Sequence, residues 1–393
     1  MQADSTIIKA IIDATRSVTG PGEHHLHIPD LTHAEKAMVG DCIDDGFVSS
    51  VGPMIPEFED RIKGFTGADH AVAMSSGTAA IHIALLAAGI KPGDEVLVPA
   101  LTFVATGNAI LYTGAVPHFV ESTPDGFGID PAALTDYLSR ISSINDAGEL
   151  INTLTGRVIR CLLPVHIFGH IGAIETLSSI ARQHNLMMVE DAAEALGSFS
   201  GGTHAGLHGD AGIISFNGNK LITTGGGGCL ITNNASLAET ARHLSTTAKK
   251  PHAFDYFHDQ LGFNYRMNNL NAALGVAQMG RLDGLLKEKI SLLDAYRQAF
   301  SGIDGASIYV HGGDEVSNYW LQALVLDKAD YDYRDTIITA AHENGLLMRP
   351  IWRLLSHLPA FADCPRMDMP QAEALVQRII NLPSSSHLGR LHA

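Results

Sequence analysis

A lysine in the middle of the chain has the surroundings of a nucleophile rather than of a surface charge. Lys220 ends the segment Ser215-Phe-Asn-Gly-Asn-Lys220, which follows the apolar run 212–214 and precedes four glycines at 225–228. A lysine at the end of a buried strand is poorly solvated, and desolvation favours its neutral amine. A neutral amine attacks carbonyl carbons and forms Schiff bases. The segment therefore indicates carbonyl chemistry at Lys220, although most lysines are solvated surface groups.

A second ionisable group ends another apolar run upstream. Asp191 follows Leu186-Met-Met-Val189 and belongs to the segment Val189-Glu-Asp-Ala-Ala-Glu194. An acid and a lysine at the ends of two buried strands suit an enzyme that uses pyridoxal phosphate (PLP). In such enzymes the lysine holds the aldehyde, and an aspartate keeps the pyridine nitrogen protonated. We expect both side chains at one site, because ligands of parallel sheets lie beyond the carboxyl ends of the strands.

Four motifs in sequence order resemble those of the DegT/DnrJ/StrS family of sugar aminotransferases. They are Ser76-Gly-Thr-Ala-Ala80, Glu190-Asp-Ala-Ala193, Ser215-Phe-x-x-x-Lys220 and Gly262-Phe-Asn-Tyr-Arg-Met-Asn268. The match runs from about Ile28 to Ala360, and four ordered motifs are far more specific than any one of them. The resemblance implies the PLP-dependent fold type I (aspartate aminotransferase-like) and a homodimer with its active site at the interface.

The order of apolar segments also predicts an α/β fold. Strand patterns at 71–75, 95–99, 116–120, 158–164, 186–190 and 212–216 alternate with helical patterns, which favours a mostly parallel central sheet sandwiched by helices. One long helix at 268–299 is expected to cross to a smaller C-terminal α+β domain. The predicted division is an N-terminal helix and arm (1–30), a large PLP-binding domain (31–270) and a small C-terminal domain (271–393).

The resemblance assigns the cofactor to named residues. Lys220 is the catalytic residue and carries PLP as an internal aldimine. Gly77 and Thr78 open a helix whose free N–H groups and dipole hold the cofactor phosphate, and the hydroxyl of Ser215 contacts the same group. Asp191 pairs with the pyridine nitrogen. Without the family, an ordinary helix cap at 76–78 explains the first motif equally well.

Three further residues have roles that the family implies. Phe103 falls where relatives stack an aromatic ring on the cofactor; its alternative is a core phenylalanine. Glu194 stands three residues beyond the aspartate, where relatives often carry a neutral or imidazole group, and this departure leaves its role open between a protonated acid near the cofactor and a substrate contact. Asn264 matches the asparagine that reaches the neighbouring subunit's cofactor phosphate.

The reaction implied is the transfer of an amino group from L-glutamate, which leaves as 2-oxoglutarate, to a nucleotide-linked keto sugar. Lysine at position 220 favours transamination, since family members that dehydrate sugars carry histidine there. The closest resemblance is to the legionaminic-acid-type (LegC-like) and perosamine-type enzymes that aminate 4-keto-6-deoxy sugars at C4. We expect UDP-2-acetamido-2,6-dideoxy-4-ketohexose as acceptor. The alternatives are GDP-4-keto-6-deoxymannose, a 3-keto sugar or a cyclitol, or a PLP-binding regulator or scaffold that is no enzyme.

Substrate contacts are expected near the end of the chain. Arg349, Trp352 and Arg353 are suited to meet the nucleotide or the sugar, because arginine pairs with phosphate and tryptophan stacks on flat rings. A packed domain surface is the alternative. His166, at the end of the strand 158–164, lines the site in one interpretation and is a hydrogen-bonded core histidine in the other.

Composition excludes several classes of protein. The formal net charge of −16 argues against nucleic-acid binding, which needs a basic surface. The four cysteines form no CxxC pair, and the trio His24, His25 and His27 fits an exposed loop better than a metal site. We expect no metal, no membrane span and no signal peptide, and a cytoplasmic location.

Overall fold

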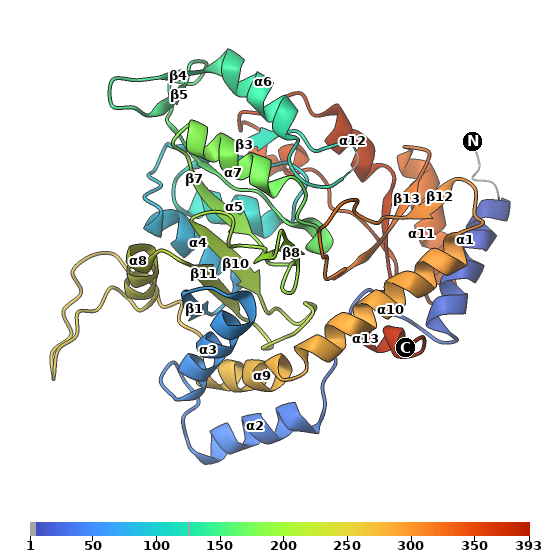
Figure 1. Cartoon of the computed structure of the whole chain (residues 1–393), viewed down its shortest axis with the longest axis horizontal. Helices are drawn as coiled ribbons and strands as arrows, with labels where there is room; N and C mark the ends of the chain where they lie inside the picture. The colour runs from blue at the N-terminus through green and yellow to red at the C-terminus, as the bar shows by residue number, and fades with distance from the viewer. Residues whose placement is uncertain (1–4, 125) are drawn as a thin grey trace.

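The computed structural model describes residues 5–124 and 126–393, and a seven-stranded sheet forms its centre (Figure 1). Five neighbouring strands run parallel, and the sixth in the spatial order pairs antiparallel with both of its neighbours. The mostly parallel sheet that the apolar pattern predicts is confirmed. In spatial order the strands are β3 (Val116–Val120), β2 (Glu95–Pro99), β6 (Ile159–Leu162), β7 (Met187–Asp191), β10 (Ala211–Ser215), β11 (Gly228–Thr232) and β1 (His70–Met74).

Helices cover this sheet, and several of them begin at side-chain caps. The Ser76 side chain accepts the N–H of Ala79 at 3.1 Å at the start of α4, and Asp130 caps α6 just before a proline at its first position. Both caps fix where the chain turns from strand to helix. The helices around the sheet are α3 (Met54–Thr66), α4 (Gly77–Ala87), α5 (Val104–Tyr112), α6 (Pro131–Ile141), α7 (Ile174–Gln183) and α8 (Ala235–Ser245). Two small hairpins, β4 (Ser142–Ile144) with β5 (Leu150–Asn152) and β8 (Phe199–Ser200) with β9 (Thr203–His204), lie outside the sheet.

The prediction of one helix over 268–299 is wrong. The chain forms α9 (Asn269–Met279) and α10 (Leu282–Phe300), with a corner at Gly280. The corner is tied to α2 (His33–Asp44): Gln278 and Arg281 donate to the Glu35 carboxylate at 2.6 and 3.1 Å. Glycine at position 280 disfavours a continuous helix. The contacts with Glu35 then fix the direction in which the chain leaves the corner.

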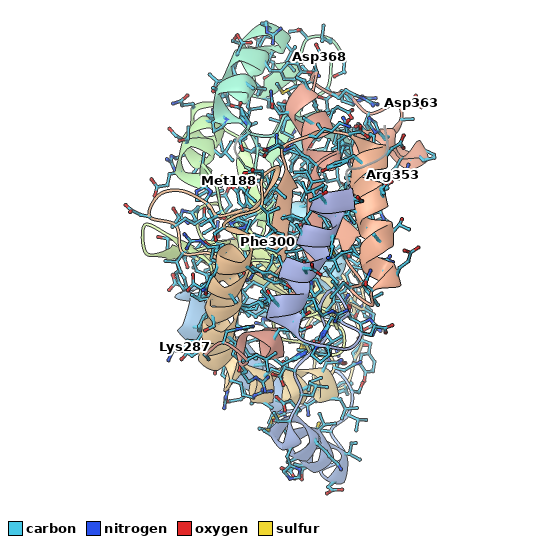
Figure 2. The ribbon with its side chains drawn as sticks, turned by 90° about the vertical axis from the view of Figure 1, so that its right-hand side faces the viewer. Met188, Lys287, Phe300, Arg353, Asp363 and Asp368 are labelled. Carbon is cyan, nitrogen blue, oxygen red and sulfur yellow. The ribbon has the colours of Figure 1, made fainter. Side chains whose placement is uncertain are left out.

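A four-stranded sheet in the order β12 (Ala306–Ile308), β13 (Gln322–Leu326), β15 (Ile379–Leu382) and β14 (Arg349–Pro350) organises the C-terminal part. Figure 2 shows α1 (Ser5–Thr19) lying between α10 and α11 (Tyr331–Glu343), and Ile11 and Val18 share an apolar cluster with Tyr296 and Phe300. The N-terminal helix therefore packs on the C-terminal part. The remaining helices are α12 (Pro370–Val376), α13 (Ser386–Gly389) and the short 3₁₀ turns η1 (Ile167–Gly169), η2 (Leu355–His357) and η3 (Pro359–Phe361).

The structure also bears on what the sequence predicts for the N-terminal histidines, for metal ligands and for membrane-spanning helices. His27, expected in an exposed loop, is buried with its ring centroid 6.3 Å from that of Trp320. Within 5–124 and 126–393, no three histidine, cysteine or carboxylate side chains cluster as metal ligands would. Over the same ranges no helix combines the length and the apolar character that crossing a membrane requires.

Candidate active site

A cavity of about 300 Å³ lies beyond the carboxyl ends of β7 and β10. This is the edge at which parallel sheets bind ligands. The chain brings together here most of the residues that the motifs singled out, although they are far apart in sequence. The predicted residues that line the cavity are Gly77, Thr78, Phe103, Asp191, Glu194, Ser215, Lys220 and Trp352.

Lys220 lies in the loop 216–227 that joins β10 to β11. Its Nζ is 3.1 Å from Oε1 of Glu194 and 3.8 Å from the centroid of the Trp320 ring. The loop is fixed beside the lysine, because the Trp320 indole donates its N–H to the carbonyl of Asn219 at 2.8 Å. A carboxylate and an aromatic face therefore hold the lysine nitrogen at a defined place in the cavity.

Glu194 has two partners, which define its structural role. One oxygen contacts Lys220, and the other accepts the backbone N–H of Phe168 at 2.8 Å. Phe168 has a φ of 57°, in the left-handed region that an L residue seldom adopts. Burial raises the pKa of Glu194, against the opposing charge of Lys220. The carboxylate thus positions both the lysine and the strained turn at Phe168.

Asp191 presents a buried carboxyl to the same cavity. The hydroxyl of Thr106 donates to it at 2.7 Å, and the N–H of Ala193 donates at 3.2 Å. Burial raises the pKa of Asp191, and these hydrogen bonds together with the charge of Lys220 act in the opposite direction. A buried carboxyl that faces a cavity is well suited to a cationic ligand group such as a pyridinium nitrogen.

The opposite part of the cavity is built for an anion. The first N–H groups of α4 have no partner within the helix, and the helix dipole adds partial positive charge there. A Cβ on Gly77 would lie 3.1 Å from that of Ser215, and one on Gly228 would lie 2.5 Å from the backbone nitrogen of Gly77. Only glycines allow this close approach of two backbones. The cavity thus combines an amine, a buried acid and an anion cradle, which fits PLP.

Four predicted residues lie outside this cavity. His166 is fully buried and its Nε2 is 2.8 Å from Glu190, a carboxylate that also accepts three backbone N–H groups. His166 is therefore a hydrogen-bonded core histidine and does not line the cavity. Asn264 is exposed, Arg349 is exposed on β14, and Arg353 lines a neighbouring cavity.

Sequence reasoning missed Thr106 and Trp320, which both line the cavity and contact its ionisable groups. Thr106 belongs to α5, within the first turn after Phe103, so its position near the predicted aromatic residue was a usable signal. Trp320 arrives from the C-terminal part of the chain, just before β13, and no local pattern marks it.

The fold and this constellation define the class of protein: a PLP-dependent transaminase. The chain belongs to the DegT/DnrJ/EryC1/StrS aminotransferase family, which matches residues 29–393. It is 36% identical to the GDP-perosamine synthase of Caulobacter vibrioides and 35% identical to that of Escherichia coli O157:H7. The first alignment covers 92% of both chains, the second 91% of this chain and 92% of the relative. The PLP form of Spr1654 from Streptococcus pneumoniae shares the fold, with a TM-score of 0.83 at 24% identity over 92% of this chain and 94% of that one.

Proposed function

We propose that this sugar aminotransferase moves the amino group of L-glutamate to C4 of a nucleotide-linked 4-keto-6-deoxy sugar. The observation that carries the proposal is the position of Lys220, which shares one cavity with Asp191 and the anion cradle at the start of α4. Bound PLP supplies an electron sink for the carbanion that forms when the α-proton of the amino acid leaves. The residues of the chain supply binding, orientation and proton transfer.

Each residue has a defined task in this reaction. Lys220 removes the proton from the α-carbon of L-glutamate and later delivers a proton at C4 of the acceptor sugar. Glu194 and Trp320 hold the lysine nitrogen between these transfers, since they contact it directly. Asp191 keeps the ring nitrogen of the cofactor protonated, and Gly77, Thr78 and Ser215 hold its phosphate. 2-Oxoglutarate leaves between the two half-reactions.

A second copy of the chain completes the proposed site. The segment that follows α8 projects away from the body (Figure 1), and it exposes Phe254, Tyr256 and Leu261 at 88%, 75% and 80%. Large apolar side chains gathered on one projecting segment are typical of protein interfaces. Asn264 follows this segment, is exposed, and does not line the cavity of its own chain. We therefore place the partner's cofactor phosphate within reach of Asn264 in a homodimer.

Two acceptors are candidates. The resemblance to legionaminic-acid-type enzymes favours UDP-2-acetamido-2,6-dideoxy-4-ketohexose, with the nucleotide near Arg349, Trp352 and Arg353. The second candidate is GDP-4-keto-6-deoxymannose, which the similarity to two GDP-perosamine synthases supports. An acceptor screen with both sugars and L-glutamate separates them.

The first test is an absorbance spectrum of the purified protein before and after addition of L-glutamate. We expect the band of lysine-bound PLP, and its bleaching when the donor is added. A keto sugar that is a true acceptor then restores the band in a single turnover. A protein that stays colourless after incubation with PLP contradicts the proposal.

A further inference from the structure

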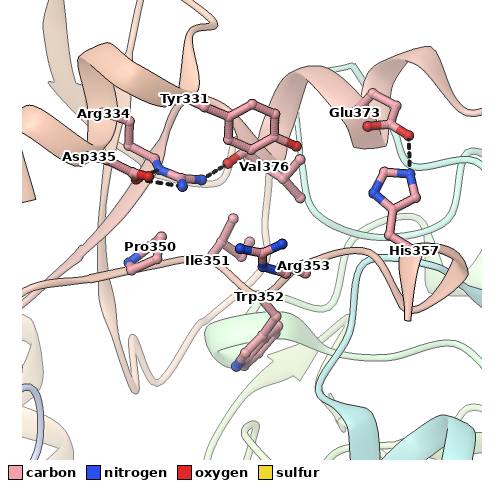
Figure 3. A pocket seen from close by; sticks show the side chains of 10 residues that line it. All are labelled: Tyr331, Arg334, Asp335, Pro350, Ile351, Trp352, Arg353, His357, Glu373 and Val376. Atoms are coloured by element: carbon pink, nitrogen blue, oxygen red, sulfur yellow. Dashed lines mark hydrogen bonds and ion pairs between the residues drawn. The ribbon is translucent and has the colours of Figure 1, made fainter. Parts of the chain in front are cut away.

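A second cavity, of about 570 Å³, adjoins the active site between α11, α12 and the segment 350–353 (Figure 3). Trp352 lines both cavities. Its ring lies 6.1 Å from that of Phe103, which lines the active site, and 5.2 Å from that of the buried Phe168 (centroid distances), and it points away from the centre of the second cavity. A substrate whose sugar lies near Lys220 can therefore continue past Trp352 into this space, which has the size of a small-molecule site.

Two arginines in this cavity differ in their partners. Arg334 is held by the Asp335 carboxylate, at 2.9 and 2.6 Å, and by the carbonyl of Val376. Arg353 is exposed and makes no hydrogen bond or ion pair with any residue in 5–124 or 126–393. Figure 3 shows it between Trp352 on one side and Tyr331 with Arg334 on the other. Its guanidinium is therefore free to bind an anion, and two parallel N–H bonds suit phosphate oxygens.

The cavity also offers a flat surface. Tyr331 is 42% exposed, and the guanidinium carbon of Arg334 lies 5.1 Å from the centre of its ring. Because Arg334 is itself fixed by Asp335 and Val376, it supports the tyrosine from one side. An aromatic ring held in this way is suited to stack on a planar base.

The second cavity also contains a carboxylate. Glu373, in the first turn of α12, has one carboxylate oxygen 2.8 Å from Nε2 of His357. An ionised carboxylate has about four acceptor sites, so most remain open to a ligand. Guanine presents two adjacent donors on one edge, N1–H and the 2-amino group, which match a carboxylate. Uracil presents one N–H between two carbonyl oxygens, which a carboxylate repels.

We propose that this cavity binds the nucleotide of the acceptor and selects guanine: Glu373 accepts from the guanine edge, Tyr331 stacks on the base and Arg353 pairs with the diphosphate. The inference rests on the proposed function, because it assumes a nucleotide-linked substrate. It goes further by choosing GDP over UDP and by naming the residue that makes the choice.

Calorimetric titration of the PLP-loaded enzyme with GDP, inosine diphosphate (IDP) and UDP tests this assignment. IDP differs from GDP only by the missing 2-amino group. We expect GDP to bind about tenfold more tightly than IDP, and UDP to bind more weakly still. Glu373→Gln should reduce the affinity for GDP about tenfold and raise that for UDP, because it removes the charge that repels the uracil carbonyl oxygens. Arg353→Ala should weaken all three nucleotides to a similar extent.

The matched control is Asp332→Asn, since Asp332 is a carboxylate on the neighbouring helix that lines a different groove. It should leave all three affinities at wild-type values. The comparison of GDP with IDP uses the unaltered protein, so it decides the question even if Glu373→Gln folds poorly. Equal binding of GDP and IDP, UDP binding as tight as GDP, or an unchanged GDP affinity in Glu373→Gln overturns the inference.

Amine transfer to a keto sugar and the preference of the second cavity for guanine can be refuted separately. Amination of a UDP-linked keto sugar without preference for guanine overturns the assignment of this cavity and leaves the proposed function standing. The expected binding pattern without amine transfer to any keto sugar contradicts the proposed function, while the nucleotide site remains.

Discussion

The Nζ atom of Lys220 lies 3.8 Å from the centre of the Trp320 ring, and the same indole donates its N–H to the carbonyl of Asn219. One side chain therefore contacts the lysine nitrogen and also fixes the backbone next to it. Trp320 is itself anchored, because the buried side-chain nitrogen of Lys289 donates to its carbonyl at 2.6 Å. The C-terminal part of the chain thus reaches directly into the reaction site.

Replacement of Trp320 should separate these two contacts. Trp320→Phe keeps an aromatic face but loses the bond to Asn219, so we expect a few-fold slower reaction with L-glutamate. Trp320→Leu removes both contacts, each of which contributes on the order of 1 kcal/mol, and should slow the reaction about tenfold or more. Stopped-flow absorbance measures this single-turnover rate. A wild-type rate in Trp320→Leu would refute a positioning role for the indole.

Lys220→Ala should abolish amine transfer while the protein still folds. The lysine is the proposed proton carrier and the attachment point of PLP, but it lies at the cavity wall rather than in an apolar cluster. Circular dichroism and the absorbance spectrum check the two statements separately. Normal turnover by this variant would end the proposed mechanism.

Asn264→Ala should weaken the retention of PLP if the asparagine serves the partner subunit. Mixing this variant with Lys220→Ala gives a sharper test. In a mixed dimer, one site then combines an intact Lys220 with an intact Asn264 of the other chain, so the mixture should be more active than the average of the two variants measured separately. If Asn264 acts within its own chain, no site in the mixed dimer is intact and mixing brings no gain in activity. Dialysis followed by spectroscopic PLP measurement checks retention.

The corner between α9 and α10 should give the protein an acid-sensitive contribution to stability. Burial alone would raise the pKa of Glu35, but hydrogen bonds from Thr32 and Gln278 outweigh it and lower that pKa to about 2. A depressed carboxyl pKa stabilises the fold above the unfolded value, near 4.5, and this stabilisation is lost as the pH falls towards 2. Glu35→Gln should therefore lower the melting temperature more at pH 7 than at pH 3.

The control for this experiment is Asp44→Asn, an exposed carboxylate on the same helix. It should shift the melting temperature little at either pH. A Glu35→Gln variant whose loss of stability is the same at pH 3 and pH 7 would contradict the assigned contacts.

Much of the site could be predicted because its residues stand at strand ends. Asp191 and Ser215 are the last residues of β7 and β10, and Ser76 caps the helix that follows β1, so apolar runs and small residues locate them. Trp320 and Thr106 could not be located in this way, since neither ends a strand of the central sheet: Thr106 lies in the first turn of α5, and tertiary packing alone brings Trp320 to the cavity. The corner at Gly280 was missed for a related reason: the apolar pattern continues across it, and contacts with Glu35 decide the break.

The predictions for the substrate residues were less successful. The end of a strand in the sequence predicts where a residue lies in the fold, but not the direction in which its side chain points. His166 lies in the segment that follows β6, yet its ring turns into the core towards Glu190. Trp352 lines both cavities, whereas its sequence neighbour Arg353 lines only the second. The side to which a residue points depends on how the segment packs, and no motif in this chain encodes it.

The chain contains two tryptophans, Trp320 and Trp352, and both line the active-site cavity. When tryptophan is excited selectively over tyrosine, the intrinsic emission of the chain therefore originates from the walls of the reaction site. Binding of the cofactor, of the amino donor or of a sugar nucleotide can be followed by this emission without any attached label, and each single-tryptophan variant reports on one wall.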